Sequence, residues 1–371
     1  MMPAKQASSG FLYPSRTMGS RWIWSFQTAI ADINKAGGVY VKEYDAKIPI
    51  EAVIADHAAD ENKAVTQAEY LCQQGIVAIL GTSAALPGAA AVAEKNGVTL
   101  MMNGSILRQP YDQGYKYLFS FFCLNDTLAI RGVDLVNSLP ADHKPKLIAN
   151  LVGQDVFGKE GGVYNDKAFT AAGYKVLDIP YTRMTTDLSS QILQMKNAGA
   201  DFVVGGVLTP DGLLLMKQMK QLGYNPKGMF IQSAPDDMTA WSSLGAEGDY
   251  VTCNANFDAS FTYPGAQDLA SRYVAQFKEP VNEAAGTCYG TVQILAAAIT
   301  AAGTLDKSKI RDAIAATDMM TVAGPAKFNP NGTSTHEGVI IQWLNQKTGV
   351  IAPDNMATTK LIYPTPLWNA R

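Results

Sequence analysis

Short apolar runs alternate with amphipathic stretches along most of this chain, and the alternation constrains the fold more than any other feature. The runs have the length of buried strands, and the stretches between them have helical spacing and end in glycine. Strand and helix in alternation are typical of a parallel sheet covered by helices on both faces. The sequence therefore predicts an α/β fold. The expected strands are 48–56, 76–81, 98–103, 146–153, 174–181, 201–207 and 229–233.

The pattern occurs twice, which predicts two similar lobes. Segments 76–98 and 201–224 both read as a strand, a loop of small residues and a helix closed by glycine, at nearly equal spacing. In open parallel sheets ligands bind beyond the carboxyl ends of the strands. We therefore expect the loops of two facing lobes to line a cleft, with the loop at 81–85 as one wall.

Composition excludes several classes of protein. The length of 371 residues suggests about two domains, and 47% hydrophobic with 17% charged residues is ordinary for a globular chain. The net charge is −3 and the 30 basic residues are scattered, so we expect no nucleic-acid partner. The most apolar predicted helix, 292–303, is too short to cross a bilayer.

The beginning of the sequence does not resemble a signal peptide. No basic segment is followed by an apolar one, so the chain is either cytoplasmic or an exported protein whose signal lies outside this sequence. A sheet that lacked its first strand would leave an unpaired neighbour. We therefore expect residues 1–4 to end a first strand that begins upstream.

Motifs for catalysis and cofactor binding are missing. Neither GxGxxG nor GxxxxGK[ST] occurs, and GTSAA departs from the GxSxG elbow of hydrolases because Ala85 stands where glycine is needed. His57, His143 and His336 lie in polar contexts that favour surface positions, and HExxH is absent. We expect no catalytic residues, no cofactor and no metal site, with a serine hydrolase as the least favoured alternative.

The four cysteines allow two disulfides but favour buried free thiols. Each lies in an apolar strand or helix pattern, and no CxxC spacing occurs. They are Cys72, Cys123, Cys253 and Cys288.

Several segments together resemble the type I periplasmic solute-binding proteins, in the branched-chain amino acid group of ABC importers. The run SSGFLYPSRTMGSRWIWSFQTAIADINKAGG is similar to the opening of that family, and VAGPAKFNPNGTSTHEGVIIQW to its closing segment. The intervening IVAILGTSAALPGAAAVAEKNGVTLMMNGS and NLVGQDVFGKEGG also match in order. The resemblance implies two α/β lobes joined by three crossing segments, which close on a small solute and deliver it to a membrane permease.

The resemblance also implies a ligand site. The turn Thr82-Ser83-Ala84-Ala85 matches the carboxylate-binding turn of the family, and free N–H groups at a helix N-terminus favour an anion on physical grounds as well. Ser83 can equally cap the helix, and the two roles can coexist. The other implied ligand-binding residues are Gly104, Ser105, Phe157, Leu208, Thr209 and Asp236.

The amino group of the family's ligands has no acidic partner at the usual position of this sequence. The acidic residue that usually binds it should fall near Ala234, with Asp236 and Asp237 displaced by two or three positions. An unpaired buried ammonium is costly. We therefore expect an aromatic or aliphatic acid ahead of a branched-chain amino acid, its apolar body contacting Phe157, Leu208 and possible rim residues Tyr13, Met18 or Trp22.

The resulting hypothesis is a periplasmic receptor of an ABC uptake system. We expect lobe I to comprise 1–121 and 256–331, lobe II to comprise 122–255 and 332–371, and the protein to be a monomer. The alternative in a different class is a cytoplasmic ligand-sensing regulator with the same fold.

Overall fold

The computed structural model describes residues 6–13, 17–82 and 87–371. These residues form two compact units, each with its own sheet. Unit 1 comprises the described residues of 1–124, 261–273 and 283–336, and unit 2 comprises 125–260, 274–282 and 337–371.

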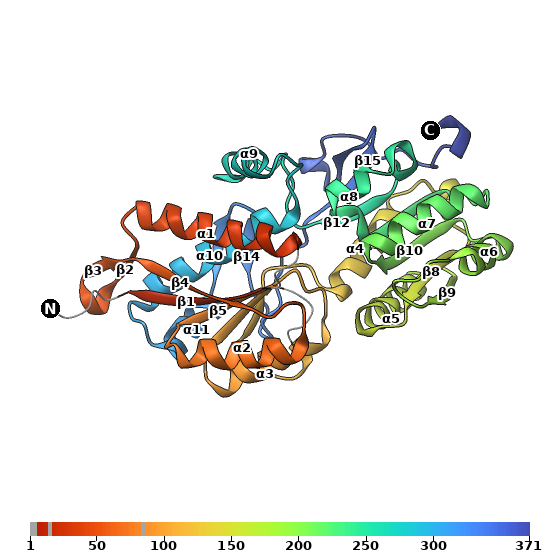
Figure 1. Cartoon of the computed structure of the whole chain (residues 1–371). Coiled ribbons are helices and arrows are strands. Elements are labelled where there is room, and N and C mark those ends of the chain that lie inside the picture. The colour runs from red at the N-terminus through yellow and green to blue at the C-terminus, as the bar shows by residue number, and fades with distance from the viewer. Residues whose placement is uncertain (1–5, 14–16, 83–86) are drawn as a thin grey trace. The chain divides into compact units, whose positions relative to one another are not determined.

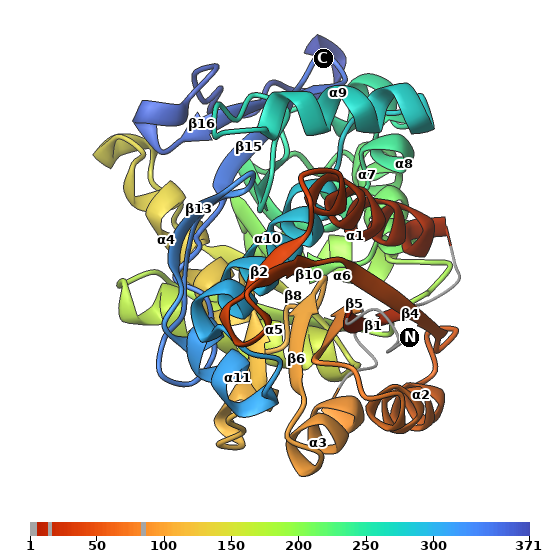
Figure 2. The same ribbon diagram turned by 90° about the vertical axis from the view of Figure 1, so that its left-hand side faces the viewer.

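Unit 1 is built on five parallel strands. In spatial order they are β4 (Ile50–Asp56), β1 (Ala7–Tyr13), β5 (Ala78–Thr82), β6 (Thr99–Asn103) and β7 (Leu118–Ser120). Helices α1 (Thr17–Lys35) and α10 (Glu283–Ala302) cover one face of the sheet, and α2 (Glu61–Gln73) and α3 (Pro87–Lys95) cover the other (Figures 1 and 2). The predicted parallel α/β architecture is confirmed in this unit.

The first strand lies further along the chain than we expected. Residues 7–13 form β1, which pairs with β4 and β5 through Ala7–Ile50 and Ser9–Ala78. We expected residues 1–4 to end a first strand, and these residues lie outside the described residues; the strand that pairs with β4 and β5 begins at Ala7. Ser8, Ser9 and Gly10 belong to this strand although small residues of this kind are typical of turns. Ser9 is nevertheless fully buried in the strand, and its hydroxyl donates to the carbonyl oxygen of Glu51 at 3.2 Å.

Helix α10 is longer than predicted. It has 20 residues, and among the described residues it is the one helix long and apolar enough to cross a membrane by length and composition. Of its most apolar window, 67% is buried inside the protein. The helix packs along α1, and Ser25 of α1 donates its hydroxyl to the carbonyl oxygen of Ala285. Its apolar composition is thus that of a core helix.

Unit 2 contains a seven-stranded sheet that is parallel at its centre and antiparallel at one side. In spatial order the strands are β16 (Lys347–Ala352), β15 (Val339–Leu344), β12 (Thr252–Ala255), β11 (Gly228–Ser233), β10 (Phe202–Val207), β8 (Ile148–Gly153) and β9 (Val176–Tyr181). Strands β8 to β12 are mutually parallel, and β15 and β16 form an antiparallel hairpin that the sequence analysis missed.

Helices cover both faces of this sheet. Apolar side chains of α4 (Asn125–Asn137) and α5 (Val156–Ala171) pack against β8, β10 and β11, whereas α6 (Ser189–Ala198) and α7 (Thr209–Gln221) lie on the other side (Figure 1). The remaining helices and strands are β2 (Val39–Val41), β3 (Ala46–Ile48), α8 (Met238–Ser242), α9 (Ala266–Phe277), α11 (Lys307–Ala315), β13 (Asp318–Thr321) and β14 (Gly324–Lys327).

The C-terminal segment is fastened to unit 2 by a buried glutamine. Gln342 of β15 is 1% exposed; its amide nitrogen donates to the carbonyl oxygen of Ile362 at 2.9 Å, and its amide oxygen accepts from the Ile362 N–H at 2.8 Å. Further along, the Trp368 indole N–H donates to the carbonyl oxygen of Tyr224 at 2.9 Å. These bonds hold residues 361–371 along β11, β12 and β15.

Replacing Gln342 with leucine should therefore destabilise unit 2. The change leaves the Ile362 N–H and carbonyl without their partners, and the loss of buried hydrogen bonds costs about 1–3 kcal/mol. Urea denaturation would measure this difference. Gln194→Leu, on the exposed side of α6, is the matched control and should change the free energy of unfolding by less than about 0.5 kcal/mol. Equal effects of the two variants would contradict the role assigned to Gln342.

Candidate functional site

In unit 1, the loops that leave the carboxyl ends of the strands all emerge at one edge of the sheet. Because β4, β1, β5, β6 and β7 run parallel, the residues that follow each of them lie on the same side. Gly104 and Ser105 follow β6 directly at this edge. The predicted carboxylate-binding residues Ser83, Ala84 and Ala85 follow β5, but they lie outside the described residues.

Gly104 provides a close approach between the backbone and an aromatic ring. Its φ of 68° is in the left-handed region, and a Cβ there would lie 3.0 Å from Cζ2 of Trp22 in α1. Trp22 itself is half-buried. Glycine is required both for the backbone conformation and for this contact.

Ser105 has a buried hydroxyl without a hydrogen-bond partner among the described residues. The residue is 1% exposed, and the neighbouring Asn103 side chain is equally buried. The Asn103 amide nitrogen donates to the Thr291 hydroxyl of α10 at 2.8 Å, while its amide oxygen is also unpartnered. Buried polar groups are nearly always paired, so two unpaired atoms at the end of one strand mark a place where a polar molecule can bind.

In unit 2, four predicted ligand residues lie at the carboxyl edge of the sheet. Phe157 is the second residue of α5, which follows β8, and it is half-buried. Leu208 and Thr209 follow β10, and the Leu208 side chain is 38% exposed. Asp236 follows β11 and ends a single helical turn. Strands β11, β10 and β8 are neighbours in the sheet, so these residues come from adjacent loops.

The two acidic residues after β11 have different environments. The Asp237 side chain accepts the Ala240 N–H at 3.1 Å and caps α8, so it is committed to the fold. The Asp236 carboxylate lies 3.7 Å from the Cys253 thiol, which donates to it. Ser233, at the end of β11, has a φ of 77°, a strained conformation for a residue other than glycine. The chain turns at Ser233, next to Ala234, where the family resemblance placed the acidic residue.

A network of charged groups, which the sequence analysis missed, connects the loops after β8, β9 and β10. Asp211 is buried in it and the Arg183 side chain is 9% exposed, whereas the Asp155 side chain is 39% exposed. The Arg183 guanidinium contacts Asp155 at 2.9 Å through Nε and donates to the carbonyl oxygen of Gly206 at 3.0 Å. Asp211, in the first turn of α7, is fully buried and accepts the Met184 N–H at 3.2 Å. The acidic residue in the first helical turn was a visible signal, because a carboxylate there is stabilised by the helix dipole.

Burial raises the pKa of the Asp211 carboxyl above its usual value, although the Met184 N–H, the Arg183 charge and the Tyr181 hydroxyl oppose this rise and Asp155 adds to it. The folded state therefore holds this proton to higher pH than the unfolded state does. The contribution of Asp211 to stability should fall as the pH rises from about 4, the unfolded pKa, through the raised folded pKa.

Asp211→Asn removes this titration and tests the assignment. The free energy of unfolding of the wild type, minus that of Asp211→Asn, should decrease from about pH 4 towards neutrality and then become constant. Urea denaturation of both proteins over this range would measure it. A difference that increases with pH would show that pairing with Arg183 outweighs burial.

Two histidines are buried, contrary to prediction. His57 follows β4 and is fully buried, and the His336 ring is 6% exposed and lies 5.1 Å from the Phe121 ring. Polar neighbours along the chain suggested surface positions, but in both places the side chain turns inward. His143 is exposed, as predicted. Among residues 6–13, 17–82 and 87–371, no group of three His, Cys, Asp or Glu side chains could hold a metal ion.

Most of the cysteines are buried, as the sequence analysis favoured. Cys123, Cys253 and Cys288 are at most 1% exposed, Cys72 is half-buried, and all four are free thiols.

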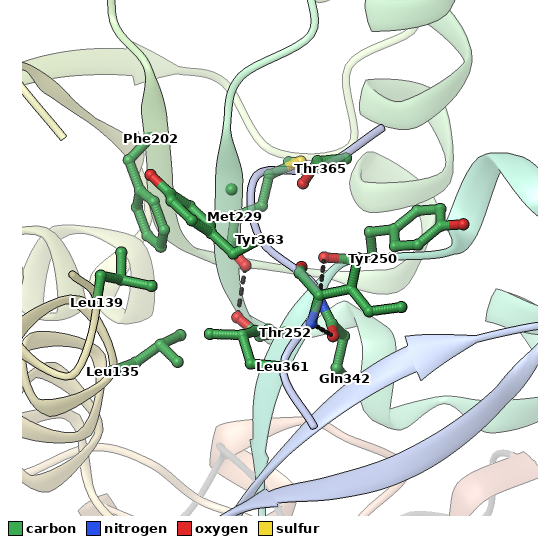
Figure 3. Close-up of a pocket in the computed structure, with 12 residues that line it drawn as sticks. Leu135, Leu139, Phe202, Met229, Tyr250, Thr252, Gln342, Leu361, Tyr363 and Thr365 are labelled. Carbon is green, nitrogen blue, oxygen red and sulfur yellow. Dashed lines mark hydrogen bonds between the residues drawn. The ribbon is translucent and has the colours of Figure 1, made fainter. Parts of the chain in front are cut away.

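A small apolar cavity in unit 2 lies away from the carboxyl edge (Figure 3). Phe202 and Gly228, the first residues of β10 and β11, line it together with Leu135 and Tyr363. Figure 3 shows the Phe202 ring beside the ring of Tyr363, which belongs to the C-terminal segment. The cavity measures about 10 Å³, room for one water molecule. It is a packing defect beneath the C-terminal segment and too small for a solute.

Comparison with known proteins supports the α/β fold with two parallel-stranded sheets. A family model described as periplasmic binding protein matches residues 12–348. A leucine-, isoleucine-, valine-, threonine- and alanine-binding protein of Pseudomonas aeruginosa is 26% identical over 325 residues, which cover 86% of this chain and 84% of that protein.

Solved structures share the fold. The LivJ substrate-binding protein of Streptococcus pneumoniae, in complex with isoleucine, superposes with a TM-score of 0.78 at 20% identity, covering 97% of this chain and 100% of the other. A fatty acid ABC transporter substrate-binding protein of Thermomonospora curvata superposes with a TM-score of 0.77 at 17% identity, covering 98% and 96%. At these identities the likeness concerns the fold alone.

Proposed function

Since the chain belongs to the periplasmic binding protein family, we propose that it is the extracytoplasmic solute receptor of an ABC uptake transporter and binds a small apolar carboxylate. The family match over residues 12–348 is the observation that carries the receptor function. The chemistry of the two carboxyl edges supports the class of solute. The membrane partner would be the permease of the same transporter, and the receptor would carry out no catalysis.

Apolar side chains at these edges support an apolar solute body. Leu208 is 38% exposed at the start of α7, Phe157 is half-buried at the start of α5, and Trp22 is half-buried beside Gly104. Partly exposed apolar side chains at the ends of parallel strands gain free energy when a solute covers them.

A hydroxyl and backbone N–H groups would hold the carboxylate. The buried Ser105 hydroxyl has no partner among the described residues, and a serine hydroxyl can donate to an anion. The predicted turn at Ser83–Ala85 would supply N–H groups at the start of α3. Charge-assisted hydrogen bonds of this kind are stronger than bonds between neutral groups.

An amino group on the solute has one candidate partner in the loop after β11. Asp237 caps α8, and Ala234 is apolar and buried, so neither would bind an ammonium group. Asp236 could bind one only if the ammonium group replaced the Cys253 thiol as its hydrogen-bond donor. We therefore propose an aromatic or aliphatic acid without an α-amino group ahead of a branched-chain amino acid. The relative from P. aeruginosa is named for amino acids and the neighbour from T. curvata for fatty acids, so both classes occur among similar proteins.

Thermal denaturation with a panel of solutes tests the solute class. Benzoate, phenylacetate and hexanoate should each be compared with leucine, valine and phenylalanine. A ligand at about 1,000 times its dissociation constant stabilises the folded state by about 4 kcal/mol, which raises the melting temperature measurably. We expect a response to at least one of the three acids. A response to the amino acids alone, lost in Asp236→Asn, would overturn the preference for an acid without an amino group.

Replacing Ser105 with alanine separates binding from folding. Because the hydroxyl is buried and unpaired, its removal should leave the free energy of unfolding unchanged or slightly higher. Loss of a hydrogen bond to a charged carboxylate should weaken binding by about 1.5–3 kcal/mol, or roughly 10-fold to 150-fold. Calorimetric titration with the strongest ligand of the panel would measure this.

The matched control is Ser9→Ala. Ser9 is also a buried serine of unit 1, but its hydroxyl is bonded to the Glu51 carbonyl. This variant should lose about 0.5–1.5 kcal/mol of stability and keep its affinity. Unchanged affinity in Ser105→Ala would remove Ser105 from the site.

A further inference from the structure

Met184, in the loop after β9, has a strained backbone and a side chain that the fold does not use. Its φ of 57° lies in the left-handed region, which few residues other than glycine and asparagine adopt. Its side chain is 65% exposed, so it adds little to the packing of unit 2. Such strain persists only where the surrounding structure enforces it, and it is concentrated at functional sites.

Buried charged groups enforce this conformation. The Met184 N–H donates to the carboxylate of Asp211 at 3.2 Å, and Asp211 is fully buried. The preceding residue, Arg183, has a side chain 9% exposed and is fixed by Asp155 and by the Gly206 carbonyl. The Met184 backbone is thus anchored at its own N–H and at the preceding residue, while its side chain is largely exposed.

The anchors belong to the loops that carry predicted ligand residues. Asp155 caps α5, of which Phe157 is the second residue, by accepting the Gly158 N–H at 2.8 Å. Asp211 lies in the first turn of α7, two residues after Thr209 and three after Leu208. The network therefore links the loop of Met184 to the two loops that carry Phe157 and Leu208.

The Arg183 side chain fits over the end of β8 because Gly153, the last residue of that strand, has no side chain. A Cβ on Gly153 would lie 2.6 Å from Nε of Arg183. Strands β10, β8 and β9 are neighbours and parallel, so the loops after all three leave the same edge of the sheet. Met184 is thus an exposed apolar side chain on the edge to which we assign solute binding.

We propose that Met184 is a specificity-determining contact for the apolar body of the solute, and that Asp211 is the residue that positions it. This inference rests on the proposed function and deepens it, since it adds the loop after β9 to the site. Methionine suits such a contact because its flexible, polarisable side chain adapts to apolar bodies of different shape. The contact should therefore matter more for long solutes than for short ones.

Calorimetric titration of Met184→Ala with hexanoate, phenylacetate and leucine tests the contact. For each of these probes that binds the wild type, we expect an affinity about tenfold lower, because a few methylene-sized contacts are worth this much in an apolar site. Butyrate, which is shorter, should lose less affinity than hexanoate. Met184→Leu keeps an apolar side chain of similar size and should retain most of the affinity.

Val163→Ala is the matched control. Val163 lies in the middle of α5 in the same unit and is also 65% exposed, but it is away from the carboxyl edge. It should bind every probe within about twofold of the wild type. If the wild type binds a probe, and Met184→Ala and Val163→Ala bind that probe with equal affinity, the inference is wrong while the proposed function still stands. A wild type that binds none of the four probes would overturn the proposed solute class, and the inference with it.

A double-mutant cycle tests the positioning role of Asp211. In the wild-type background, Asp211→Ala should weaken binding by about as much as Met184→Ala does. In the Met184→Ala background, the same Asp211→Ala change should weaken binding by less than about twofold. A purely structural Asp211 would give independent, additive losses of affinity, which would contradict the positioning role.

Discussion

The parallel pairing of strands is the constraint on which the rest of the structure depends. Parallel neighbours need a helical crossover between them, so each sheet collects its loops and helix N-termini at one edge. Gly104 and Ser105 are brought to such an edge in unit 1, and Phe157, Leu208 and Asp236 in unit 2. Residues far apart in sequence become neighbours in this way without any direct pairing between their side chains.

Close backbone approaches make this edge compact. A Cβ on Gly158 in α5 would lie 2.3 Å from the carbonyl oxygen of Gly153 in β8, so only glycine lets the helix begin this near the strand. The absence of a side chain at Gly153 leaves room for Arg183 over the end of β8. These two glycines thus allow the positions of Arg183 and Asp155, and the contacts of this pair hold the loop that contains Met184.

Much of the fold could be predicted from the sequence because alternation of strand and helix is a local pattern. Strands β8 to β11 lie where the apolar runs indicated, and helices connect them; Gly37 and Gly38, which follow α1, both have positive φ. The errors arose where tertiary packing outweighed local composition. Small polar residues became strand β1, and His57 turned inward from a polar loop.

The candidate site could be predicted only in part, for a related reason. A family resemblance points to positions such as Ser105 and Phe157, but it does not tell which polar atoms stay unpaired. The burial of Asp211, the left-handed backbone of Met184 and the contact of Asp236 with Cys253 all depend on groups distant in sequence. Under the proposed function these features would affect which solute is bound, and they become visible only in three dimensions.

Mass spectrometry of the small molecule that is released when the purified protein is denatured tests the central claim most directly. The account predicts a carboxylic acid with an apolar body, present in a defined ratio to the protein and without an α-amino group. A sugar, a nucleotide or a polyamine in that ratio would contradict it, because none of these molecules combines a carboxylate with an apolar body.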